Sequence, residues 1–215
     1  MKPKIIIIGD VHLGRSLNIG KPAVGSSLNS RVSDQFTLLN FTLEQAVEHE
    51  VSRIVLTGDV FEDSRPDFNL VNLFVQWLKS VEAEEIAVDI VLGNHEIRRT
   101  GTRVISVLDM INLIDFPHIT LYKQITTLDL NGISLVLIPF QDRKGLDQDS
   151  NKLAVQKLTD ILHYELLDCP NSNIKIGVGH LALEGALWVS DEIDDLANEI
   201  VCPLSSFYGF DYVWM

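Results

Sequence analysis

The chain is poor in cysteine and in long hydrophobic runs, and each shortage excludes a class of protein. Its 215 residues include two cysteines, Cys169 and Cys202, which lack the spacing of a metal site and get no functional role here. The first apolar run, Ile5 to Ile8, is too short for a signal peptide or a membrane span. We therefore expect a cytoplasmic protein with no membrane partner.

Positive charge is also scarce. The chain has 17 Lys and Arg against 30 Asp and Glu, a formal net charge of −13. A protein that holds nucleic acid by the electrostatic field of its own surface needs that surface to be basic. The acidic composition therefore argues against this mode of binding. Nucleic acid as a substrate is not excluded, because a partner could supply the basic surface. A solvated acidic surface explains most of the charge.

No Gly/Ser-rich or Pro-rich linker divides the sequence, and 46% of the residues are hydrophobic, so we expect one domain over residues 1–215. Short apolar runs alternate with stretches of helical period, which predicts a parallel α/β sheet. The expected strands are residues 5–8, 54–57, 86–92 and 174–179. Expected helices cover residues 36–51, 67–81 and 154–166, the second capped by Asp67. The residues expected to face inward are Phe36, Leu39, Leu43, Val47 and Val51 in the first helix, and Leu70, Phe74, Trp77, Leu78 and Val81 in the second.

Two further segments differ from this pattern. Residues 104–114 are apolar nearly all round, which predicts a helix buried on more than one side. Asn131-Gly132 separates two strand-like stretches, and this pair suits the tight turn of an antiparallel hairpin. A last strand is expected from Tyr212.

Polar side chains follow each of the expected parallel strands. The central case is Asp59, which ends the run Ile54-Val-Leu-Thr-Gly-Asp. Ligands of α/β sheets bind at the carboxyl ends of the strands, so we expect these residues to converge at one sheet edge. The residues concerned are Asp10, His12, Asp59, Asn94, His95 and His180.

Carboxylate, amide and imidazole ligands in this mixture suit Mn²⁺, Fe²⁺ or Zn²⁺ better than an all-oxygen calcium site. A carboxylate such as Asp59 can bridge two ions, and two ions about 3.5–4 Å apart clamp the oxygens of a phosphoryl displacement. A single Gly-Asp is usually only a turn, and a single histidine is usually structural. Four such motifs in series predict a metal site and phosphoester hydrolysis. His49, His118 and His163 are expected to be surface or structural residues.

The motifs Asp10-Val-His12, Gly58-Asp59, Gly93-Asn94-His95-Glu96 and Gly179-His180 resemble the signature of calcineurin-like metallophosphoesterases. Within that superfamily, the residues from His12 to Arg15 and from Gly58 to Asp63 resemble SbcD-type DNA-repair nucleases and their phage counterparts. Protein phosphatases have Val-Asp-Arg-Gly where this chain has Phe-Glu-Asp-Ser. The resemblance implies an α/β sandwich of mixed β-sheets flanked by helices.

The resemblance also implies two divalent ions, with Mn²⁺ foremost. Asp10, His12 and Asp59 would hold one ion, and Asp59, Asn94 and His180 the other. His95 would be the catalytic residue, with Glu96 in support. Arg15, Arg98 and Arg99 either contact phosphate or serve solubility.

The function implied is the nuclease subunit of a DNA-end-processing complex in a bacterial or phage-infected cell. DNA would be the substrate, an SbcC-type ATPase the partner, and residues 104–114 part of a homodimer interface. The alternatives are a small-molecule phosphodiesterase or phosphatase, and a non-catalytic subunit that only binds the ATPase. The family's Gly-His-x-His loop does not follow Trp214, so we expect an incomplete C-terminus without capping and ATPase-binding regions, and weak metal binding and activity.

Overall fold

A computed structural model describes residues 3–15, 19–21, 28–100, 103–185 and 200–215. The chain forms two compact units, an N-terminal unit, Pro3–Tyr122, and a C-terminal unit that begins at Lys123. Each unit has its own four-stranded sheet and its own apolar core. That residues 1–215 act as one domain stays a prediction.

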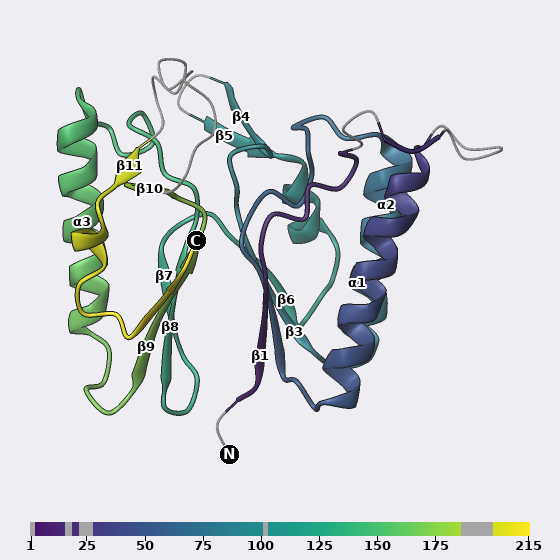
Figure 1. The fold of residues 1–215 in the computed structure, drawn as a ribbon, viewed down its shortest axis with the longest axis horizontal. Helices are drawn as coiled ribbons and strands as arrows, with labels where there is room; N and C mark the ends of the chain where they lie inside the picture. Colours follow the sequence, from purple (N-terminus) through teal and green to yellow (C-terminus); the bar gives the residue numbers. More distant parts are fainter. Residues whose placement is uncertain (1–2, 16–18, 22–27, 101–102, 186–199) are drawn as a thin grey trace. The chain divides into compact units, whose positions relative to one another are not determined.

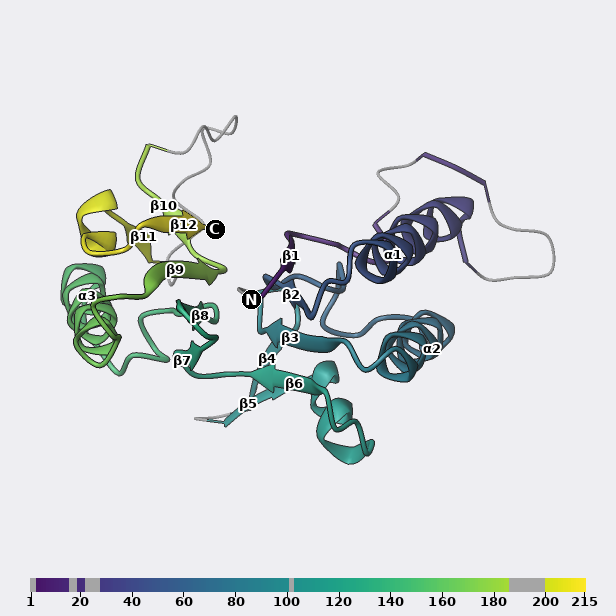
Figure 2. The same cartoon turned by 90° about the horizontal axis from the view of Figure 1, so that it is seen from below.

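The sheet of the N-terminal unit is entirely parallel, with strand order β1-β2-β3-β6. Two helices connect the first three strands and lie side by side on one face of the sheet (Figures 1 and 2). The predicted parallel α/β arrangement is therefore confirmed. The elements are β1 (Ile5–Ile8), α1 (Ser30–Glu48), β2 (Arg53–Leu56), α2 (Phe68–Ala83), β3 (Ala87–Val91) and β6 (Ile119–Tyr122).

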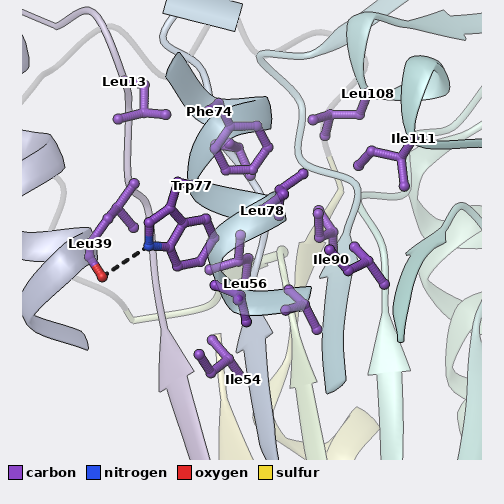
Figure 3. Close-up of a cluster of buried hydrophobic side chains, with 14 of the residues drawn as sticks. Leu13, Leu39, Ile54, Leu56, Phe74, Trp77, Leu78, Ile90, Leu108 and Ile111 are labelled. Atoms are coloured by element: carbon purple, nitrogen blue, oxygen red, sulfur yellow. Dashed lines mark hydrogen bonds between the residues drawn. The ribbon is translucent and has the colours of Figure 1, made fainter. Parts of the chain in front are cut away.

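Helix α2 forms as its sequence predicts. The Asp67 side chain accepts a hydrogen bond from the backbone N–H of Asn69 at 2.8 Å, as an N-cap does. The indole N–H of Trp77 donates to the carbonyl of Leu39 on α1 at 3.0 Å, which ties the two helices together (Figure 3). The buried residues of α2 are the five predicted to face inward, Leu70, Phe74, Trp77, Leu78 and Val81.

Helix α1 differs from its prediction in its bounds and at one residue of the inward stripe, Val47. It begins at Ser30, because the Asn29 side chain caps it by accepting from the N–H of Arg31 at 2.9 Å. Its buried residues are Val32, Leu39 and Ala46. Leu39 of the expected inward stripe is buried and Phe36 and Leu43 pack against the same core, but Val47 is 49% exposed.

The helix predicted for residues 104–114 is wrong. The chain instead forms an antiparallel hairpin, β4 (Ile97–Thr100) and β5 (Arg103–Ser106), and then a 3-10 helix, η1 (Val107–Leu113). The β-branched pair Val104-Ile105 favours strand, and the Ser106 hydroxyl accepts from the N–H of Leu108 to start the new helix.

Leu108 and Ile111 of η1 lie in the core of the N-terminal unit (Figure 3). They are 0% and 3% exposed, so they are core residues. These two side chains are therefore not available to a second copy of the chain. That residues 104–114 form part of a homodimer interface stays a prediction. In η1 it is Leu113 that faces solvent, at 87% exposed.

The sheet of the C-terminal unit is mixed, with strand order β12-β9-β8-β7. The predicted hairpin is confirmed: β7 and β8 are antiparallel, and Asn131 and Gly132 between them both have positive φ, 46° and 95°. β9 lies parallel to β8, and β12 lies parallel to β9. The strands are β7 (Thr126–Asp129), β8 (Ile133–Ile138), β9 (Ile174–Gly179) and β12 (Tyr212–Trp214).

Helix α3 (Asn151–Leu167) packs against this sheet, again as predicted. Ala154, Leu158 and Leu162 are fully buried in one cluster with Val136 and Ile138 of β8. A short pair, β10 (Ala182–Leu183) with β11 (Val201–Cys202), and the 3-10 helix η3 (Leu204–Phe207) complete the unit. The fold is thus the predicted mixed α/β class with sheets flanked by helices.

Both cysteines are buried free thiols, and burial raises the pKa of Cys202 to about 12. A thiol with such a pKa is unreactive at neutral pH. Among the described helices, none is both long and apolar enough to cross a membrane.

Candidate metal centre

The carboxyl ends of β1 and β2 are joined by main-chain hydrogen bonds that continue beyond the strands. The N–H of His12 donates to the carbonyl of Asp59, and that of Leu13 to Val60, both at 2.8 Å. The N–H of Glu62 donates back to the carbonyl of Leu13 at 3.1 Å. The first two polar motifs of the sequence are therefore held side by side.

Three of the predicted site residues have a left-handed backbone conformation. The φ angles of Asp10, His12 and Asp59 are 43°, 46° and 45°. Few residues other than glycine adopt positive φ, and such strained conformations cluster at functional sites.

Asp59 is fixed from two sides. Its side chain is almost fully buried, and Oδ1 accepts a hydrogen bond from the backbone N–H of His95 at 3.0 Å. Gly93 makes this approach possible: a Cβ there would lie 2.1 Å from the backbone nitrogen of Asp59 and 2.2 Å from Oδ1. Position 93 therefore requires glycine, because Asp59 occupies the space that any side chain there would need.

The other carboxylate oxygen of Asp59 faces two imidazoles. Oδ2 lies 3.7 Å from Nε2 of His12 and 3.7 Å from Nε2 of His95, and the two rings meet edge to face with centroids 4.9 Å apart. Ligand atoms at about 2.0–2.2 Å from one ion stand roughly 3.0–3.6 Å apart. The two distances of 3.7 Å are slightly longer than this, and the donor atoms of the three residues all lie within 4.8 Å of one another, so they form a cluster that could hold a divalent cation.

The remaining predicted residues of the N-terminal unit lie in the same loops. Asp10 is exposed after β1, with a carboxylate oxygen within 4.8 Å of one of Asp59. Asn94 is half-buried after β3, and its carbonyl accepts from the N–H of Ile97 at 3.3 Å. The three neighbouring strand ends thus bring together Asp10, His12, Asp59, Asn94 and His95.

His180 lies in the C-terminal unit, directly after β9. Its N–H donates to the carbonyl of Ile138 at 3.0 Å, and its ring meets that of Phe140 with centroids 6.4 Å apart. The prediction that all four strands belong to one sheet is wrong, because the β7–β8 hairpin starts a second sheet that β9 joins. That His180 is a metal ligand stays a prediction.

Two glutamates complete the loops, and the family resemblance implies a supporting role for one of them. Glu96 is fully buried, and its carboxylate accepts from the N–H of Phe61 at 2.9 Å and of Gly93 at 3.1 Å. It thus ties the loop after β2 to the loop after β3. The other, Glu62, was missed; the only signal in the sequence is its place three residues after Asp59.

The arginines considered as phosphate contacts differ in their surroundings. Arg15 is about half-exposed, with Nε 3.9 Å from Oε1 of Glu62. Arg98 on β4 is exposed. The side chain of Arg99 lies outside the described part of the structure.

The other histidines are structural or on the surface, as predicted. His118 Nδ1 lies 2.6 Å from a carboxylate oxygen of Glu82, which joins the end of α2 to the start of β6. His49 ends α1, and His163 is an exposed residue of α3.

The chain is similar in sequence to a DNA repair protein. It is 26% identical over 210 residues to the DNA double-strand break repair protein Mre11 of Methanopyrus kandleri. The match covers 97% of this chain and 42% of that protein, so the chain spans less than half the length of this relative.

Similar solved structures include a nuclease and a phosphatase. The nuclease MPE of Pseudomonas putida has 13% identity and a TM-score of 0.36, over 80% of this chain and 59% of that one. A dimetal phosphatase from Danio rerio has 14% identity and a TM-score of 0.46, over 86% of this chain and 71% of that one. The family model described as calcineurin-like phosphoesterase matches residues 3–215, and the chain therefore belongs to this family.

Proposed function

We propose that the chain is a divalent-metal-dependent phosphodiesterase that cleaves DNA as the nuclease subunit of an SbcCD-type DNA-end-processing complex. The observation that carries the hydrolase chemistry is Asp59 Oδ2, held 3.7 Å from Nε2 of both His12 and His95. DNA as the substrate is supported by the similarity of nearly the whole chain to a DNA double-strand break repair protein.

For the metal ligands we propose the two sets implied by the family resemblance, with Mn²⁺ as the ion. Asp10, His12 and Asp59 hold one ion, and Asp59, Asn94 and His180 hold the other. When bound, the ions polarise the scissile phosphate and neutralise the charge that develops on it. Asp59 suits the bridging position because its buried carboxylate is fixed by the N–H of His95.

His95 acts on the leaving group in this proposal. Its side chain is 36% exposed, so a substrate can reach it. Nδ1 donates to the carbonyl of Glu62, which leaves Nε2 as the nitrogen that faces the centre. In its cationic form the ring donates the Nε2 proton to the leaving oxygen of the phosphodiester.

The partners proposed are DNA, an SbcC-type ATPase and a second copy of the chain. With a net charge of −13, the chain needs a basic surface from elsewhere to retain DNA, which favours an assembly over a lone subunit. In the N-terminal unit, Phe68 and Leu113 are large apolar residues, 82% and 87% exposed, and suit a homodimer contact.

The test compares hydrolysis of linear duplex DNA and of a nucleotide monoester in the presence of Mn²⁺. We expect cleavage of the duplex, and a loss of roughly 10²–10⁴-fold in kcat for His95→Gln, because one proton transfer is removed. The surface variant His163→Gln is the matched control and keeps full activity. Hydrolysis of the monoester alone would favour the small-molecule phosphatase, and binding of the ATPase without any hydrolysis would favour the non-catalytic subunit.

A further inference from the structure

Glu62 contacts both imidazoles of the candidate centre. Its Oε2 lies 2.8 Å from Nδ1 of His12, and its main-chain carbonyl oxygen lies 2.6 Å from Nδ1 of His95. Nε2 of each ring faces Asp59. One residue thus touches the two rings on the nitrogens that face away from the carboxylate.

The contact with His95 fixes the position of a proton. A carbonyl oxygen can only accept a hydrogen bond, so Nδ1 of His95 must carry the hydrogen. The neutral ring then has its lone pair on Nε2, the atom that faces Asp59 Oδ2.

The contact with His12 has the same consequence. Nδ1 of His12 and Oε2 of Glu62 are both buried, and among the described residues neither makes a hydrogen bond of good geometry to any group. Buried polar atoms require partners, and these two are 2.8 Å apart. An ionised carboxylate only accepts, so it favours the Nδ1–H form of His12 and leaves Nε2 as the donor atom for a cation.

We propose that Glu62 is a positioning residue that holds His12 through its carboxylate and His95 through its main-chain carbonyl, both as Nδ1–H tautomers with Nε2 turned towards Asp59. The two contacts come from different atoms of one residue. Substitution of the side chain therefore separates them.

The main chain at Glu62 is anchored independently of its side chain. The N–H of Glu62 donates to the carbonyl of Leu13 at 3.1 Å, and the neighbouring N–H of Phe61 donates to Glu96 at 2.9 Å. A shortened side chain at position 62 therefore leaves the carbonyl against His95 in place. His95 becomes an internal control for His12.

The experiment uses side-chain ¹⁵N chemical shifts of the metal-free protein, at an alkaline pH at which imidazoles are neutral, assigned with His12→Gln and His95→Gln. In the wild type we expect the Nδ1–H form for both residues. In Glu62→Ala we expect His12 to shift to the Nε2–H form, which a free imidazole side chain prefers, while His95 stays unchanged. Glu62→Gln keeps an acceptor oxygen and should retain the Nδ1–H form of His12.

The second readout is the affinity for Mn²⁺ by calorimetry, which rests on the proposed function. We expect Glu62→Ala to bind Mn²⁺ about 10–100-fold more weakly, the usual effect of losing the partner of a ligating histidine. The matched control Asp63→Ala removes the adjacent exposed carboxylate and should change the affinity less than twofold.

An unchanged His12 tautomer in Glu62→Ala would overturn the proposal, and so would a change at His95 in the same variant. If the wild type binds no Mn²⁺, the proposed function fails, while the tautomers still decide the role of Glu62.

Discussion

At the scale of single residues, the sequence predicted the chemistry of the site and a supporting role for Glu96, but not the contacts of Glu62. Asp10, Asp59 and His95 follow apolar strands, so both their type and their place could be recognised. The contacts of Glu62 could not, because they depend on left-handed backbone angles at three residues that a sequence pattern does not reveal. Nor does the sequence show that the glycine before Asn94 leaves room for Asp59.

Gly93→Ala should therefore damage the site although it adds only one methyl group. The new Cβ would meet the backbone of Asp59 at 2.1 Å, and backbone moves less readily than a side chain tip. We expect a loss of about 1–3 kcal/mol in the free energy of unfolding, measured with denaturant, together with weaker Mn²⁺ binding in calorimetry. Gly177→Ala is the control, because its Cβ would meet side-chain atoms rather than backbone, namely the Phe210 ring at 3.2 Å and Cδ1 of Ile138 at 3.7 Å. Equal effects of the two variants would refute the close fit.

At the scale of elements, strongly periodic segments were predicted well and ambiguous ones were not. The inward residues of α2 and α3 recur at helical spacing, and Asn131-Gly132 marks its turn. Residues 104–114 carry no such periodicity, so their apolar character fitted a helix and a strand equally well. The capping hydroxyl of Ser106 and the pairing of β5 with β4 decided the outcome.

The strands β2, β3 and β6 also share a buried polar group. Asp89 of β3 is 2% exposed, forms an ion pair with Arg53 of β2, and is hydrogen-bonded by Tyr122 of β6. Burial raises the pKa of Asp89 above 3.8, although Arg53 and Tyr122 act to lower it. Burial also raises the pKa of Tyr122, and the charge of Asp89 adds to that shift.

This shift predicts how stability depends on pH. The folded protein keeps the Asp89 proton at pH values where the unfolded chain has lost it, so Asp89 favours folding on the acid side. That contribution is lost as the pH rises from the unfolded value of 3.8 through the folded pKa. Asparagine does not titrate, so Asp89→Asn should not lose stability in this way. From pH 4 to pH 7, the unfolding free energy of the variant should therefore rise relative to that of the wild type. The exposed control Asp115→Asn should show no such shift in chemical denaturation.

At the scale of the whole molecule, the sequence predicted the family and the fold class, because the four motifs and the alternation of strands and helices extend along the whole chain. The family resemblance implied more than one sheet, but the sequence did not show which strands belong to which sheet. The apolar runs of β3 and β9 look alike, and nothing in them says which neighbour each strand pairs with. The side of η1 that faces solvent depends on the same long-range packing.

Because of this packing, a homodimer contact would have to use other residues than Leu108 and Ile111. Leu108 and Ile111 are core residues, so a charge at either position would unfold the protein rather than separate two copies. Phe68, which opens α2, and Leu113, which closes η1, are 82% and 87% exposed and can be replaced at a cost within about 0.5 kcal/mol of folding stability. We expect the wild type to sediment as a dimer and Phe68→Glu/Leu113→Glu as a monomer with an unchanged unfolding midpoint. Leu167→Glu, at a residue of α3 that is 79% exposed, should remain dimeric and serves as the control. A double variant that keeps the dimer mass would place the interface elsewhere, and a wild type that sediments as a monomer at all concentrations would refute the homodimer.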